Sequence, residues 1–96
     1  MDRYPEDTEL KKIAEWDYHD FHGLMEYVKE LWKYPERISQ FHQDNRTQYA
    51  ISTGGWSGNE DIIGALMNNT MFWMICWESS KRGGHYVFEI KDKDNG

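Results

Sequence analysis

A glycine-rich segment separates a predicted strand from a predicted helix in the second half of the chain. Residues 54–58 read Gly-Gly-Trp-Ser-Gly, and glycine favours turns and close backbone approaches. Residues 46–53 before it alternate between side chains of two faces, which predicts a half-buried strand. After it, Ser57 and Glu60 have the spacing of a capping box, which predicts a helix over residues 57–68.

Hydrophobic periodicity predicts the remaining elements. In residues 20–34 the apolar side chains recur at helical spacing, and Thr8 can cap a shorter helix before them. Residues 71–78 have apolar side chains on both faces, which indicates a central strand, and the alternating residues 85–90 are its hairpin partner. We expect residues 36–41 to form a further turn of helix.

The order helix, helix, strand, helix, strand, strand predicts a single α+β domain over residues 1–96. In this fold, N-terminal helices pack on a largely antiparallel three-stranded sheet. We expect residues 1–7 and 91–96 to be flexible. Helices cover one face of the sheet, so the predicted strand would place Trp73, Ile75 and Trp77 on the other face, where they could form a homodimer contact.

Charge and composition narrow the classes of partner. The chain has 11 Lys and Arg against 17 Asp and Glu, a formal net charge of −6. Duplex nucleic acid is therefore not expected as a partner, because its phosphates need clustered cations. No apolar run has the length of a membrane span, and we expect a cytoplasmic protein. The single cysteine, Cys76, lies in an apolar segment that predicts a buried thiol rather than a nucleophile.

Two segments are candidate binding surfaces: the glycine-rich loop and the turn around Arg82. The loop has a simpler interpretation as a helix cap and the turn as a hairpin connection, but Trp and Arg are favoured in interfaces. Aromatic residues make up 16% of the chain, so either the core is built mainly of rings or some rings meet a partner. The candidate binding residues are Trp56, Ser57, Asn59, Glu60, Arg82, His85 and Tyr86.

Catalytic and metal sites have little support in the sequence. His19 and His22 are three residues apart, but a metal site needs at least three ligands and no third is evident, so we expect no metal and no cofactor. The chain has no G-x-S-x-G motif. Glu60 and His85 could act as an acid–base pair only if the fold brings them together. We therefore expect no enzyme.

Several short motifs resemble a family of small uncharacterised proteins encoded by bacteriophages and prophages. They are Gly55-Trp56-Ser57-Gly58-Asn59-Glu60, Phe72-Trp73, Arg82-Gly83-Gly84-His85-Tyr86 and Phe88-Glu89-Ile90, and the resemblance covers about residues 10–90. It implies a phage or prophage gene product in the cytoplasm of a bacterial host. It implies no activity, cofactor or site residue.

The favoured hypothesis is a non-enzymatic protein-interaction module that binds a host or phage protein. One alternative is a self-associating, homodimeric accessory module that uses the predicted tryptophan face. The other is a binder of single-stranded nucleic acid, in which aromatic rings stack on the bases. Its platform would consist of Tyr49, Trp73, Arg82 and Tyr86.

Overall fold

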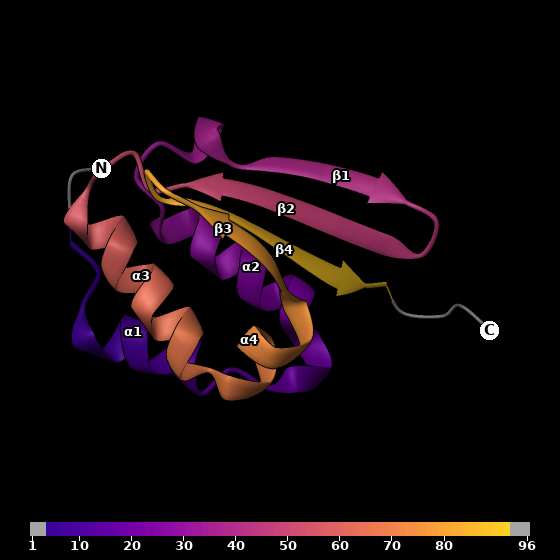
Figure 1. The fold of residues 1–96 in the computed structure, drawn as a ribbon. Coiled ribbons are helices and arrows are strands. Elements are labelled where there is room, and N and C mark those ends of the chain that lie inside the picture. Colours follow the sequence, from indigo (N-terminus) through magenta and orange to yellow (C-terminus); the bar gives the residue numbers. More distant parts are fainter. Residues whose placement is uncertain (1–3, 93–96) are drawn as a thin grey trace.

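An antiparallel sheet with the strand order β1-β2-β4-β3 has helices on one side (Figure 1). The computed structural model describes residues 4–92. The elements are α1 (Asp7–Ala14), α2 (Phe21–Leu31), β1 (Ser39–Gln43), β2 (Arg46–Ser52), α3 (Ser57–Asn68), α4 (Thr70–Cys76), β3 (Trp77–Lys81) and β4 (His85–Lys91), with 3-10 turns at Tyr18–Asp20 and Pro35–Arg37. The predicted α+β class is confirmed.

The core between the sheet and the helices is rich in aromatic rings. Tyr49 of β2 lies opposite Phe88 of β4, and both are buried. Phe72 of α4 packs on Phe88, with ring centroids 5.0 Å apart, and meets Phe21 of α2 edge-on at 5.2 Å. Tilted and edge-on aromatic pairs of this kind stabilise a core beyond the area that they bury. A small domain therefore obtains much of its core from a few large side chains.

Two aspartates begin the second helical segment. The Asp17 carboxylate accepts a hydrogen bond from the backbone N–H of His19, and the Asp20 carboxylate accepts one from Gly23 at the first turn of α2. These bonds satisfy N–H groups that have no partner within the helix. A Cβ atom at Gly23 would overlap the Asp20 carboxylate, so glycine allows the cap to close over the helix.

Asn59 ties the start of α3 to the end of α2. Its side chain is fully buried. The Nδ2 group donates to the carbonyl oxygens of Lys33 at 2.8 Å and Thr53 at 3.1 Å, and Oδ1 accepts from the N–H of Lys33 at 2.9 Å. Three backbone groups of two connecting segments are thus satisfied by one side chain.

Asn69 performs the same task at the other end of α3. Its Nδ2 group donates to the carbonyl oxygens of Ile13, in the last turn of α1, at 3.0 Å and of Trp16, just beyond that helix, at 3.2 Å. Its Oδ1 atom accepts from the N–H of Phe72 at 3.1 Å and so caps α4. One buried amide therefore joins the end of α1 to the beginning of α4.

The strand predicted over residues 71–78 is wrong: its first part is the helix α4. With the Asn69 cap in place, Phe72 and Cys76 are four residues apart on one helical face, and both are buried. Apolar side chains on both faces of the segment suggested a central strand, but tertiary packing outweighs that pattern. β3 begins only at Trp77.

The predicted number of strands is also wrong, because the sheet within residues 4–92 has a fourth strand, β1. The helical turn predicted over residues 36–41 is limited to Pro35–Arg37, and β1 pairs with β2 from Ser39 opposite Ala50 onward. All five side chains of β1 are exposed, so the strand has no alternation that sequence reasoning could detect.

The ends of the chain are described only in part. Asp7 already belongs to α1 and Lys91 to β4, so these two residues of the segments predicted to be flexible are in regular structure. Residues 1–3 and 93–96, for which flexibility was also predicted, lie outside the described residues.

We predict that Asn69→Ala lowers the free energy of unfolding by about 2–4 kcal/mol, because it removes a helix cap and the hydrogen bonds that the buried amide donates to two backbone carbonyl groups. Urea denaturation followed by circular dichroism measures the effect. The control is Asn68→Ala, at the neighbouring exposed asparagine. Equal stability of the two variants would contradict the structural role of Asn69.

Candidate functional site

The fold brings the glycine-rich loop and the Arg82 turn to the same end of the sheet. The N–H of Thr53 donates to the carbonyl oxygen of Gly84 at 2.9 Å, and Ser52 pairs with His85 between β2 and β4. Gly84 has φ of 81°, and a Cβ atom there would overlap the Thr53 side chain, so the close contact requires glycine. We call this region the loop–hairpin end.

The seven candidate binding residues do not form one surface. Asn59 is buried and bonded to backbone groups, and Tyr86 is half-buried on the inner face, where its ring packs edge-on to Trp73. The other five belong to the loop–hairpin end: Ser57, Glu60, Arg82 and His85, which are exposed, and Trp56, which is half-buried.

The capping box predicted for Ser57 and Glu60 is wrong. The N-cap position is Trp56, and no side chain caps the helix there. The hydroxyl of Ser57 instead donates to the hydroxyl of Tyr4 at 3.2 Å. The Trp56 ring lies over Gly58, and its centroid is 5.0 Å from that of the Tyr4 ring.

The residues of the predicted homodimer face also have a different arrangement. Trp73 is half-buried and stacks on Trp77, with centroids 6.0 Å apart and an interplanar angle of 16°. Ile75 is 59% exposed and Trp77 40%. Because residues 70–76 are helical, the three side chains do not share a strand face.

The helix instead creates a different exposed apolar surface. Met71, Met74 and Ile75 have the i, i+3, i+4 spacing of one helical face, and Met74 is 76% exposed. Trp77 follows directly at the start of β3. We call Met71, Met74, Ile75 and Trp77 the α4 surface. Four large apolar side chains so close together in sequence and all exposed are unusual for a monomer.

The aromatic platform predicted for single-stranded nucleic acid is not formed. Tyr49 is 3% exposed, and its hydroxyl is 3.2 Å from His22 Nδ1. Trp73 and Tyr86 are half-buried against each other, whereas Arg82 is exposed on the hairpin loop. The rings therefore have no common exposed face on which bases could stack.

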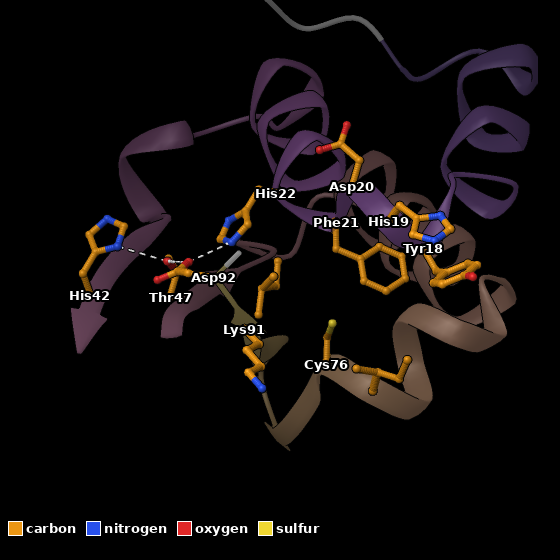
Figure 2. Close-up of a pocket in the computed structure, with 12 residues that line it drawn as sticks. Tyr18, His19, Asp20, Phe21, His22, His42, Thr47, Cys76, Lys91 and Asp92 are labelled. Carbon is orange, nitrogen blue, oxygen red and sulfur yellow. Dashed lines mark hydrogen bonds and ion pairs between the residues drawn. The ribbon is translucent and has the colours of Figure 1, made fainter. Parts of the chain in front are cut away.

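A pocket of about 660 Å³ lies between α2, α4 and the end of β4 (Figure 2). Phe21, Ile75, Cys76 and Ile90 contribute its apolar lining. A chain of polar groups on the other side connects His42, Thr47, Asp92 and His22. The volume and the mixed lining are typical of a small-molecule site.

Sequence reasoning missed three of the polar residues in this pocket. His42 lies on β1, which was not predicted, and Asp92 was assigned to a flexible tail. Thr47 is fully buried, and it shares the inner face of β2 with Tyr49 and Ile51. The signal available in the sequence was a threonine at a position that strand alternation places on the same face as large apolar residues.

The two histidines near the start of α2 have separate partners. His19 Nδ1 is 2.9 Å from the Asp17 carboxylate, on the exposed surface. The hydrogen bond that the carboxylate accepts from the backbone of His19, together with the His19 side chain, lowers the pKa of Asp17. His22 Nε2 is 2.8 Å from Asp92 Oδ1. Within residues 4–92, no group of three or more His, Cys, Asp or Glu side chains is placed to hold a metal ion.

Comparison with known proteins gives no match: no protein-family model, curated protein or solved structure is significantly similar to this chain. The resemblance to phage-encoded proteins therefore stays a prediction. In the part of the chain that the structure describes, no helix has the length and apolarity to cross a membrane.

Cys76 is predicted to be unreactive in the folded protein. Burial raises the pKa of its thiol from 9.0 to about 12, and the negative charge of Glu78 adds to the shift. At about pH 8 the nucleophilic thiolate is therefore far scarcer in the folded chain than in the unfolded one. We expect iodoacetamide to label Cys76 slowly in buffer and rapidly in urea, measured by mass spectrometry. Equal rates would show that the thiol is accessible.

Proposed function

We propose that this protein is a non-enzymatic protein-interaction module that binds a host or phage protein through the α4 surface. The main observation in support of this proposal is the group of exposed apolar side chains on α4 and at the start of β3. Clusters of exposed apolar side chains on a folded protein often mark an interaction site. The resemblance to phage-encoded proteins supports, as part of this proposal, an action in the cytoplasm of a bacterial host.

The chemistry of α4 supports a contact with another protein. Residues 70–76 contain no charged side chain, so the contact requires little desolvation of charge. Met71 and Met74 are unbranched and polarizable, which suits a surface that adapts to the shape of a partner. Trp77 adds a large ring, the type of side chain that most often dominates binding energy.

Charge favours a different protein over a second copy of this chain. The α4 surface is flanked by Glu78, next to Trp77, and by Asp20, which lines the same pocket as Ile75. Two copies with a net charge of −6 each would repel one another. The partner that fits is an apolar patch with basic residues at its rim.

Affinity capture from bacterial lysate tests the proposal with the double variant Met74→Ser, Ile75→Ser. We expect a captured protein to be retained at least about tenfold less by this variant, because two buried apolar contacts together contribute more than 1.4 kcal/mol. The matched control is Phe41→Ser, since Phe41 is as exposed as Ile75 but lies on β1. Mass spectrometry with labelled lysates gives the ratios.

The loop–hairpin end is the competing contact surface. If Trp56→Ala, Arg82→Ala loses the captured protein and the α4 variant keeps it, the assignment to α4 is wrong. If all variants capture the same proteins in the same amounts, neither surface mediates binding.

We predict that the protein is monomeric at micromolar concentrations, because like charges oppose association through the α4 surface. Light scattering coupled to size-exclusion chromatography measures the molar mass. A dimer that dissociates in Met74→Ser, Ile75→Ser would support the homodimeric alternative and assign the α4 surface to self-association.

A further inference from the structure

We propose that the pocket beside α4 binds a small molecule that carries an amine or amidine cation on a flat apolar body. The pocket shares only Ile75 with the α4 surface, and it lies at the opposite end of the β2–β4 pair from the loop–hairpin end. The inference rests on the direction of the hydrogen bonds around Asp92, which determines which groups remain for a ligand.

The hydroxyl of Thr47 determines the direction of the hydrogen bonds between Asp92 and His42. Thr47 Oγ1 is 2.8 Å from Asp92 Oδ1 and 3.0 Å from His42 Nδ1. The Asp92 carboxylate can only accept, so the single hydroxyl proton of Thr47 goes to it. The contact with His42 then requires the proton on Nδ1 of the imidazole. In the neutral ring, His42 Nε2 is left as an acceptor.

His22 is the second group in contact with the Asp92 carboxylate. Its Nε2 atom is buried and lies 2.8 Å from Asp92 Oδ1, in ion-pair contact but without the geometry of a hydrogen bond. Its Nδ1 atom, 3.2 Å from the hydroxyl of Tyr49, accepts. Burial, with the charges of Glu26 and Asp92, raises the pKa of Tyr49 to about 12, so the phenol keeps the proton that it donates.

The resulting network offers acceptors to the pocket. Thr47 donates to Oδ1 of Asp92 and His22 Nε2 lies beside the same oxygen, so the contacts within residues 4–92 leave the second carboxylate oxygen, Oδ2, unused. His42 Nε2 is also an acceptor in the neutral ring. A ligand that satisfies these atoms must bring N–H donors, and a cation adds an ionic contribution with the carboxylate. An anionic ligand would meet repulsion.

The apolar part of the pocket lining is the reason for proposing a ligand with a flat apolar body. Phe21, Ile75 and Ile90 line the same pocket as the polar network, and its volume of about 660 Å³ can hold an aromatic ring. Figure 2 shows the Phe21 ring on the opposite side of the pocket from His42 and Thr47. The other charged groups of the lining are Asp20 and Lys91. Strand alternation places Lys91 on the opposite face of the sheet from Ile90, and Figure 2 shows its side chain directed away from Asp92. The carboxylate is therefore the nearest charge in the polar part of the pocket.

Titrations followed by two-dimensional amide NMR test this with three probes. Benzamidine has the proposed ring and cation, benzoate has the ring with the opposite charge, and acetamidine has the cation without the ring. We expect saturable benzamidine shifts at Phe21, Thr47 and Asp92 in the millimolar range usual for so small a ligand. Benzoate should cause none, and acetamidine should bind at least about tenfold more weakly.

The decisive variant is Asp92→Asn. The amide oxygen can keep the hydrogen bond from Thr47 and the contact with His22, while the amide nitrogen replaces the free acceptor with a donor and the charge is lost. We expect the benzamidine affinity to fall at least about tenfold. Asp44→Asn is the matched control, because Asp44 lies in the β1–β2 turn with φ of 57°, a conformation that asparagine adopts readily. It should bind as the parent chain does.

Three outcomes would overturn the proposal: no saturable shifts with benzamidine, benzoate binding as tight as benzamidine binding, or unchanged affinity in Asp92→Asn. The spectrum of the ligand-free variant shows whether its fold is kept. If Asp92→Asn does not fold, the variant His42→Phe, on the exposed strand β1, is tested in its place. Retained benzamidine affinity in His42→Phe would also overturn the proposal.

Discussion

The structure depends on two buried asparagines at the ends of α3. Short helices leave many unpaired backbone groups at their ends, and such groups are costly when they are buried. Asn59 satisfies groups just beyond the end of α2 and in the loop before α3, and Asn69 satisfies groups in and just beyond the last turn of α1 and at the start of α4. All four described helices are therefore joined by side chains at the two ends of α3.

The Asn69 cap also determines which side of α4 faces the core. With the helix beginning at Thr70, Phe72 and Cys76 turn inward, while Met74 and Ile75 turn outward. If the segment were a strand, alternate residues would face each way and Ile75 would share a face with Trp73. The same seven residues thus supply part of the core, one wall of the pocket and the exposed α4 surface.

The pocket combines groups from segments that are far apart in the chain. His22 belongs to α2, His42 to β1, Thr47 to β2, and Asp92 follows β4. The buried Thr47 and Tyr49 hold Asp92 and His22 in a defined arrangement, since each supplies a hydroxyl to one of them. Groups whose protons are committed to internal bonds present a ligand with a definite set of acceptors.

The sequence by itself determined the elements whose side chains follow a period: α2, β2, α3 over the predicted residues, and β4 as a hairpin strand. It did not reveal β1, because that strand is held by backbone pairing with β2 while all its side chains are exposed. It did not reveal α4, whose apolar residues suit a strand as well as a short helix. Only the tertiary structure decided that the loop–hairpin end is separate from the pocket. The physical reason is that strand register and helix packing bring distant residues together, and no local pattern encodes either of them.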